Sequence, residues 1–339
     1  MSKKSIIFGI LFLMMISACK KENQQTPVVY VAGHQLNGAD NWIAKYWKNG
    51  KLINLSDGTK SELTNTIVVQ NGNVYVSGTA YYDGFSVAKY WKNGTGINLT
   101  DGTANAFTTD MKVVNNDIYI SGSVIEDGIY KAVYWKNGII NYLTNGPNYA
   151  GASSIFILNN NVFVGGYKRA ANGNLVAMYW KNSAPFVIST SANYSRVDDI
   201  AAKGDSVISF GSIDDKPTFW LANTAFEIVT DLLTPKKVVF NGDDMYILFS
   251  GFDTEIDNRA NAYLKNGVIN IIDEPSRQGI TLNDIFISGS DVYLAGNDTN
   301  NDGASPMIAH YWKNGKSYNL TSENTAERRA EATSVFVVE

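Results

Sequence analysis

Short runs in which apolar and polar residues alternate fill the chain from about residue 28 onward. Turns rich in Gly, Asn and Asp separate these runs, as at residues 71–73 between the runs at residues 67–69 and 74–76. Alternation with a period of two, bounded by such turns, is typical of β-strands with one buried face. No stretch of this part keeps a helical period for more than a turn or two. The pattern predicts an all-β chain.

The phrase Tyr-Trp-Lys-Asn-Gly recurs along this part of the chain. Complete or nearly complete copies begin at Tyr46, Tyr90, Tyr134, Tyr179 and Tyr311, and degenerate copies begin at Trp220 and Tyr263. The asparagines of the seven copies lie 44, 44, 45, 41, 43 and 48 residues apart. This period is typical of the four-stranded blades of β-propellers. We therefore expect one repeat domain, although the length alone would allow two.

A second phrase, of the type Val-Tyr-Val-Ser-Gly, stands upstream of each Tyr-Trp phrase. It occupies residues 29–33, 74–78, 118–122, 162–166, 207–211, 246–251 and 292–296. Each repeat then has four predicted strands, except that the first repeat lacks its innermost strand. Residues 334–338 have the composition of that missing strand. We predict a seven-bladed β-propeller over residues 28–339, closed by the C-terminal strand joining blade 1, so that the ring has no open seam.

The repeated Trp-Lys-Asn-Gly has a structural interpretation. A tryptophan at a fixed place in every blade is expected to pack between neighbouring sheets. The Lys-Asn-Gly that follows predicts a hairpin turn in which Asn or Gly has a positive φ.

The first 18 residues have the features of a bacterial export signal. Lys3 and Lys4 precede an apolar run over residues 6–16 that is too short to span a bilayer. The run is followed by Ser-Ala before Cys19, which resembles the lipobox of bacterial lipoproteins. That resemblance implies removal of residues 1–18 and attachment of lipid to Cys19, the only cysteine of the chain. Residues 19–27 would then form a polar tether, and the membrane would be a partner through the lipid anchor.

The repeat phrases resemble the Bacteroidota-type YWKNG-repeat β-propeller lipoproteins over essentially all of residues 28–339. This resemblance implies a lipid-anchored protein of the cell envelope. The Lys-Lys-Glu after Cys19 resembles the start of lipoproteins displayed on the outer membrane, which implies surface exposure. No ligand or reaction comes with the resemblance.

The charge of the chain disfavours nucleic acid as a partner. Without the two lysines of the leader, 26 basic residues stand against 32 acidic ones. We expect a monomer without a cofactor.

The predicted loops between second and third strands, such as residues 79–85 and 167–174, and those between blades vary in length, and all six arginines fall in or at the ends of these loops. Variable loops on a rigid scaffold are where binding usually resides, and Arg and Tyr are suited to it. We therefore place a ligand site for a protein or a glycan on this face. The candidate residues are Arg169, Arg196, Arg277, Arg328, Tyr82, Tyr149, Tyr167 and Tyr194. The alternative is that these arginines only brace the loops.

Catalytic chemistry has less support in the sequence. The chain holds two histidines, of which His34 is expected in a loop and His310 in the packed part of a blade. No nucleophile elbow, phosphate loop or zinc-protease motif is present. Asp198 and Asp199 are adjacent and are expected on opposite faces of a strand. The alternative function is therefore a glycosidase or lyase whose acidic residues meet at the mouth of the central channel.

One segment has the spacing of a calcium loop. Asp298, Asn300 and Asp302 precede a glycine, as in the first half of such a loop, but Ala309 stands where the bidentate Glu is expected. We expect an ordinary hairpin loop here and no metal.

Overall fold

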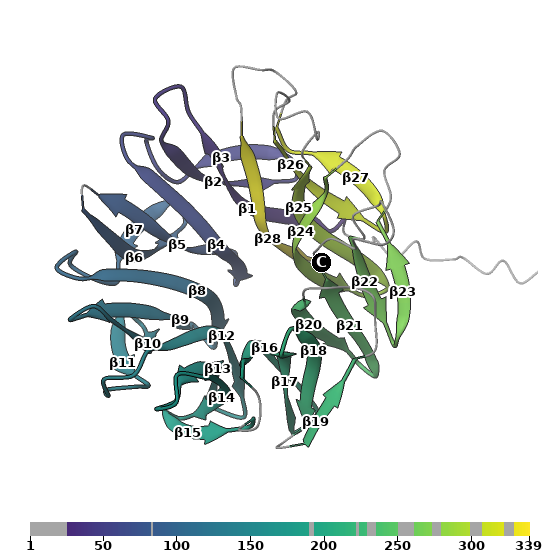
Figure 1. Cartoon of the computed structure of the whole chain (residues 1–339). Helices are drawn as coiled ribbons and strands as arrows, with labels where there is room; N and C mark the ends of the chain where they lie inside the picture. Colours follow the sequence, from purple (N-terminus) through teal and green to yellow (C-terminus); the bar gives the residue numbers. More distant parts are fainter. Residues whose placement is uncertain are drawn as a thin grey trace, which may run out of the picture.

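The computed structural model describes residues 26–339 except residue 83 and residues 190–192, 222–223, 229–234, 250–260, 273–278, 299–306 and 322–328. The predicted leader, Cys19, Arg277, Arg328, Asn300 and Asp302 lie outside the described residues. The described part forms seven four-stranded antiparallel sheets in a ring, with strands as its only regular elements (Figure 1). In the described ranges no helix could cross a membrane. The predicted all-β, seven-bladed propeller is confirmed.

The four strands of each blade follow one another outward from the central channel. The innermost strands are β28 (Ala330–Val338), β4 (Ser61–Gln70), β8 (Asn105–Val114), β12 (Ala150–Leu158), β16 (Ser195–Lys203), β20 (Pro235–Asn241) and β24 (Thr281–Ser288). The second strands are β1 (Val28–Leu36), β5 (Asn73–Tyr82), β9 (Asp117–Glu126), β13 (Asn161–Arg169), β17 (Ser206–Ile213), β21 (Asp244–Phe249) and β25 (Asp291–Asp298).

The two outer strands of each blade are shorter. The third strands are β2 (Trp42–Lys48), β6 (Phe85–Lys92), β10 (Ile129–Lys136), β14 (Leu175–Lys181), β18 (Lys216–Leu221), β22 (Ala262–Lys265) and β26 (Ile308–Lys313). The outermost are β3 (Lys51–Asn54), β7 (Thr95–Asn98), β11 (Ile139–Tyr142), β15 (Ala184–Val187), β19 (Thr224–Glu227), β23 (Val268–Ile271) and β27 (Lys316–Asn319).

Blade 1 is completed by the end of the chain. β28 pairs with β1 in antiparallel register, from Val28 opposite Val338 to Gln35 opposite Ala330. Val335 and Val337 are buried in the core between blades 7 and 1. The predicted closure of the ring by the C-terminal strand is therefore confirmed.

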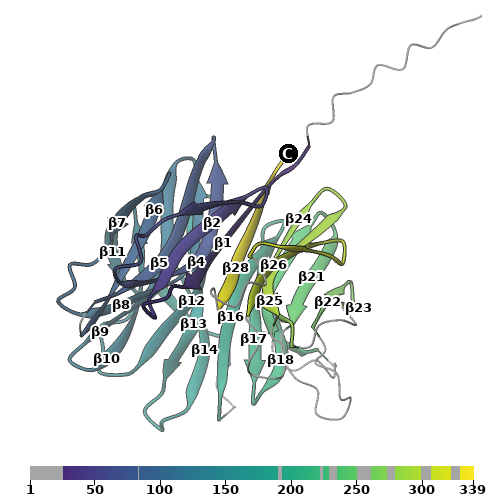
Figure 2. The same ribbon diagram turned by 90° about the horizontal axis from the view of Figure 1, so that it is seen from above.

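The turns between first and second strands and between third and fourth strands lie on one face, which we call the hairpin face. The opposite face, with the loops between second and third strands and between blades, is the loop face. Glu339 accepts a hydrogen bond from Ser288 at the hairpin turn of blade 7. Figure 2 shows the C-terminus and the start of β1 on the same side of the disc. β1 therefore begins at the hairpin face, where Val29 donates its backbone N–H to Asn49 of the turn between β2 and β3.

The repeated phrase has a structural role in each blade. The six tryptophans of the phrase are at most 1% exposed. The asparagine side chain accepts the backbone N–H at the start of the second strand, as Asn93 does from Val74 at 2.9 Å. In six blades the lysine Nζ lies 5.1–5.5 Å from the centre of an aromatic ring on the second strand. These contacts and the positive φ of the turn asparagines confirm the packing and hairpin interpretations.

Every innermost strand carries a β-bulge in its pairing with the second strand. In β16 the register with β17 shifts between Val197 and Asp199, so that Asp198 is the extra residue. A bulge turns two consecutive side chains toward the same side. Asp198 and Asp199 accordingly both line the central channel, and the expectation that they point to opposite faces is wrong.

Some loops predicted on the loop face are shorter than expected. β5 continues to Tyr82 and β6 begins at Phe85, so most of the predicted loop at residues 79–85 belongs to the two strands. Tyr167 and Arg169 likewise lie in β13. The long strands hold these side chains more rigidly than loops would.

Candidate functional site

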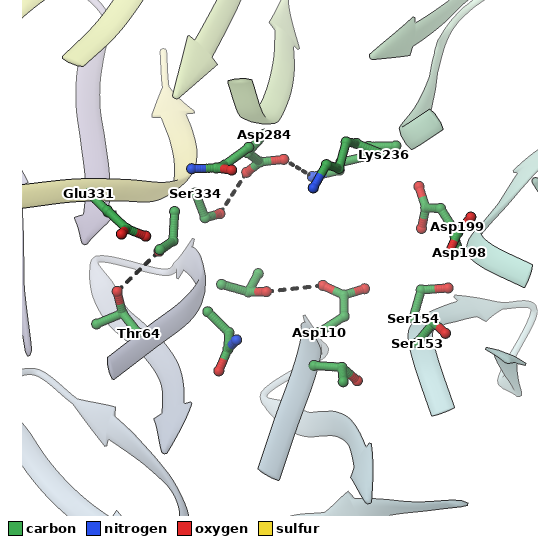
Figure 3. Close-up of a pocket in the computed structure, with 16 residues that line it drawn as sticks. Thr64, Asp110, Ser153, Ser154, Asp198, Asp199, Lys236, Asp284, Glu331 and Ser334 are labelled. Atoms are coloured by element: carbon green, nitrogen blue, oxygen red, sulfur yellow. Dashed lines mark hydrogen bonds and ion pairs between the residues drawn. The ribbon is translucent and has the colours of Figure 1, made fainter. Parts of the chain in front are cut away.

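The bulges surround a pocket of about 290 Å³ in the central channel (Figure 3). Its lining is almost wholly polar and comes from all seven innermost strands. The residues are Thr64, Asn65, Thr66, Thr109, Asp110, Ser153, Ser154, Asp198, Asp199, Lys236, Lys237, Asn283, Asp284, Glu331, Thr333 and Ser334. This clustering of carboxylates is the feature that the enzyme alternative requires.

Three of these carboxylates connect neighbouring blades. The carboxylate of Asp110 accepts the backbone N–H groups of Met111 (2.7 Å) and of Ile155 in the next blade (3.2 Å). That of Asp199 accepts those of Ile200 and of Val238 in the next blade, both at 2.9 Å.

Asp284 repeats this arrangement between blades 7 and 1. Its carboxylate accepts the N–H groups of Ile285 and Val335, both at 2.9 Å, and the hydroxyl of Ser334 at 2.6 Å. It also forms an ion pair with Lys237. These three aspartates are therefore ties between blades, with few lone pairs left for a substrate.

Asp198 differs from the three ties. One carboxylate oxygen lies 2.7 Å from Nε of Arg196, and the other has no hydrogen-bond partner among the described residues. Burial raises the pKa of Asp198 to about 6, against the opposing charges of Arg196 and Lys236. Burial likewise raises the pKa of Asp199 to about 6. For Asp110, burial is outweighed by the charges of Lys112 and Lys237, which hold its pKa below the ordinary value.

A cluster of tyrosines and arginines lies on the loop face, beside the channel. We call it the Tyr–Arg cluster; its members are Tyr130, Tyr149, Tyr167, Arg169, Tyr194 and Arg196, from blades 3, 4 and 5. Arg169 is exposed and the others are half-buried.

Four members of the cluster contact one another, and Tyr194 and Arg196 form a separate pair. The ring of Tyr149 lies 4.6 Å from that of Tyr130 and stacks on that of Tyr167 at 6.1 Å. The guanidinium of Arg169 lies 5.8 Å from the centre of the Tyr149 ring. Burial and a hydrogen bond with Tyr149 raise the pKa of the Tyr167 hydroxyl, which therefore stays neutral.

Arg196 connects the cluster to the channel. Its Nη1 donates to the hydroxyl of Tyr194 at 2.9 Å, while its Nε is held by Asp198. Arg196 is thus a brace, as the alternative interpretation of the arginines holds. No ion pair of Arg169 is found in the part of the chain that the structure describes.

Of the predicted ligand residues, the structure brings together Arg169, Arg196, Tyr149, Tyr167 and Tyr194. Tyr82 lies elsewhere, between blades 1 and 2, with Nζ of Lys60 at 4.2 Å from its ring centre.

The two histidines are both buried. His34 lies in β1 and is 6% exposed, so the expectation of a loop residue is wrong. Its Nε2 is 3.5 Å from Glu331, and its ring packs against Trp42 at 4.8 Å. His310 is fully buried, as predicted, with Nε2 at 3.1 Å from Asp298.

The predicted calcium-like segment is described only at Asp298. This carboxylate is 5% exposed and pairs with His310, inside the blade. No group of three metal-binding side chains occurs among the described residues.

Apart from Asp198 and Asp199, the channel residues were not predicted, although the sequence carries a signal for them. In each repeat two polar residues precede the apolar run of the innermost strand, as Asn283-Asp284 precede Ile285 and Thr333-Ser334 precede Val335. Tyr130 was missed because nothing in its local pattern distinguishes it from other strand residues.

No protein-family model and no curated protein matches the chain. Solved structures do resemble it. A puromycin-hydrolysing peptidase of Mycobacterium tuberculosis has a TM-score of 0.58 at 10% identity, over 87% of this chain and 52% of its own. The Pyrococcus horikoshii acylaminoacyl peptidase has a TM-score of 0.53 at 10% identity, over 89% of this chain and 52% of its own.

A putative 6-phosphogluconolactonase from Bacteroides fragilis has a TM-score of 0.50 at 11% identity, over 94% of this chain and 99% of its own. The chain thus spans about half the length of the two peptidases. At such identities these likenesses show the propeller fold alone.

Proposed function

We propose that the protein is a non-catalytic binding propeller of the bacterial cell envelope, which holds a partner protein on its loop face at the Tyr–Arg cluster. The observation that carries the proposal is the continuous contact of half-exposed tyrosines with the exposed Arg169. Tyr and Arg are enriched among the residues that dominate binding energy at interfaces. Rings already packed against one another lose little side-chain entropy on binding.

The start of β1 at the hairpin face supports a particular orientation. If Cys19 carries the lipid, the tether would join the propeller at the start of β1, on the hairpin face. The loop face then points away from the membrane, toward a partner. Display at the outer membrane is part of the proposal and rests on the Lys-Lys-Glu that follows Cys19.

A binding experiment tests the proposal. Envelope proteins are captured on the full chain, and the retained partner is then titrated against Arg169→Ala, Tyr149→Ala and Lys92→Ala. Truncating a dominant contact removes about 2 kcal/mol, so the two cluster variants should bind roughly thirtyfold more weakly. Lys92, on the hairpin face, serves as the control and should have little effect.

Two outcomes would contradict the proposal. Equal binding by all three variants would place the site away from the cluster. If the cluster retained a glycan and no protein, the proposal would have named the wrong class of partner.

A second candidate function is supported by two channel carboxyl groups whose pKa values are shifted in opposite directions. Asp198 has its pKa raised by burial, whereas the hydrogen bond with His34 lowers the pKa of Glu331. They face each other across the pocket (Figure 3), and a proton donor opposite an ionised carboxylate is the arrangement of glycosidases. Release of reducing ends from a panel of polysaccharides, lost in Asp198→Asn, would support an enzyme. No release at any pH from 5 to 7 would refute it.

A further inference from the structure

Two equivalent pockets open between the outer strands of neighbouring blades. We call them the junction pockets: one lies between blades 1 and 2 and measures about 540 Å³, and the other lies between blades 2 and 3 and measures about 640 Å³. Both exceed the channel pocket and fall in the size range of small-ligand sites, about 300 to 1,000 Å³.

The loop that bounds each pocket comes from the same repeat positions, whereas the aromatic side chains come from different ones. The first is bounded by residues 54–57 and Thr59, and the second by residues 98–101 and Thr103, which are the same positions one repeat later. The pockets are therefore a product of the repeat and not of one irregular loop.

An aspartate is held in the same way at the edge of each pocket. One carboxylate oxygen of Asp57 accepts the backbone N–H of Thr59 at 2.9 Å and its hydroxyl at 2.7 Å. Asp101 does the same with Thr103, at 3.0 and 2.7 Å. These hydrogen bonds lower the pKa of both carboxyls, which are fully exposed and ionised at neutral pH. Each carboxylate keeps its second oxygen for a ligand.

Each pocket combines an apolar wall with a polar one. In the first, Tyr82 and Leu55 are the apolar groups; Lys60, with Nζ at 4.2 Å from the centre of the Tyr82 ring, and Glu62, paired with Lys89 at 3.0 Å, are the polar ones. In the second, Ile140 and Tyr142 are the apolar groups, and Glu126 accepts hydrogen bonds from the Tyr142 hydroxyl and from Lys131.

The ring of a sugar has the matching amphipathic character, since its C–H face packs on apolar or aromatic groups and its hydroxyls donate to carboxylates. Lys60 and Lys89 balance Asp57 and Glu62 in the first pocket, and Lys131 pairs with Glu126 beside the second, so neither pocket has the excess of one charge that would attract an ionic ligand.

We propose that the two junction pockets bind the sugar residues of a neutral glycan, one residue in each pocket. This site is separate from the Tyr–Arg cluster and would exist whether or not that cluster binds a protein. Two sites on one rigid rim let a surface of repeated sugars bind at both, so that retention exceeds that of either site alone.

The test is an array of immobilised neutral and acidic oligosaccharides probed with the full chain. The proposal predicts retention on neutral glycans, weakened at least tenfold by Tyr82→Ala or Tyr142→Ala and lost in the double variant. Tyr149→Ala, in the Tyr–Arg cluster, is the matched control and should bind as the wild type does.

A second pair of variants guards against loss of fold. Asp57→Asn and Asp101→Asn keep an acceptor for the turn hydrogen bonds and remove only the charge. Combined, they should also abolish retention. The proposal is overturned if no neutral glycan is retained, if the double variants bind normally, or if Tyr149→Ala alone removes binding. Only the last outcome would bear on the Tyr–Arg cluster, so failure of this proposal is distinguishable from failure of the proposed function.

Discussion

Gly151 lies directly against the ring of Tyr167, so that a methyl group at position 151 would stand 2.7 Å from the tyrosine Cζ. The two residues are paired between β12 and β13. The absence of a side chain on Gly151 is what lets the ring lie flat and stack on Tyr149.

The first prediction follows from this contact. Gly151→Ala should displace Tyr167 and lower the free energy of unfolding by about 1 to 3 kcal/mol, as overpacking does. Urea unfolding measures the change. Gly146→Ala, in the preceding loop, is a matched control because nothing lies within 4 Å of the added carbon. Equal effects of the two substitutions would show that the contact with Tyr167 is unimportant.

The second prediction concerns the tie at Asp284. Asp284→Ala leaves Lys237 without its ion pair and the N–H of Val335 without an acceptor. Breaking a buried pair in this way typically destabilises by about 3 to 5 kcal/mol. Because the unpaired ammonium carries much of that penalty, adding Lys237→Met should restore part of the stability. A double variant no more stable than Asp284→Ala would contradict this account.

The third prediction is a pH dependence at Asp198. Its pKa is about 6 in the folded protein, above the ordinary value of 3.8, so the folded state binds the proton more tightly than the unfolded state. Stability from this group is thus present below about pH 4 and is lost as the pH rises through 6. The shift corresponds to a free energy on the order of 2 to 3 kcal/mol.

Thermal unfolding of wild type and Asp198→Asn between pH 4 and 7 measures this effect. The stability of the wild type relative to the variant should fall as the pH rises. A constant difference across this range would show that Asp198 titrates normally.

The fourth prediction concerns ring closure. A chain ending at Thr333 lacks the strand residues that pair with Val28 to Ala32, including the buried Val335 and Val337. Loss of these strand residues should lower the free energy of unfolding by several kcal/mol, a large part of a typical folding stability of about 5 to 15 kcal/mol. Melting within a degree or two of the full chain would contradict the role of this strand.

The fifth prediction is lipid attachment at Cys19. Cells fed an alkyne fatty acid should label the wild-type protein, and Cys19→Ser should remove the label, because no other cysteine is present. Equal labelling of both proteins would refute the proposed anchor.

The fold could be predicted from the sequence because the same pattern of strands and turns occurs seven times. The buried tryptophans and the asparagine turns are local features, and their regular spacing defines the blades. The first repeat lacks an innermost strand and the chain has one extra strand after the last repeat, so the pattern also predicts that this last strand joins blade 1.

The candidate site could be predicted only in part. Strand alternation wrongly separates Asp198 from Asp199, because a bulge is not visible in the period of the pattern. Tyr82 was expected in a loop, but β5 extends to this residue. Its side chain therefore lies in a junction pocket, away from Tyr149 and Tyr167. Contacts between blades, such as that of Asp284 with Val335, depend on how neighbouring sheets are placed. The pattern of residues along each strand does not reveal that placement.

The pairing of β1 with β28 also determines when the molecule can finish folding. β1 is synthesised before every other strand of the propeller and β28 after them, so the pair of Val28 and Val338 joins the two extremes. Such distant contacts form late and slowly. Until then blade 1 is a three-stranded sheet with a bare inner edge, the kind of edge to which other chains add. The last nine-residue strand therefore acts as the protein's own cover for its earliest strand, and a ribosome that stalls before Ala330 releases a chain prone to aggregate.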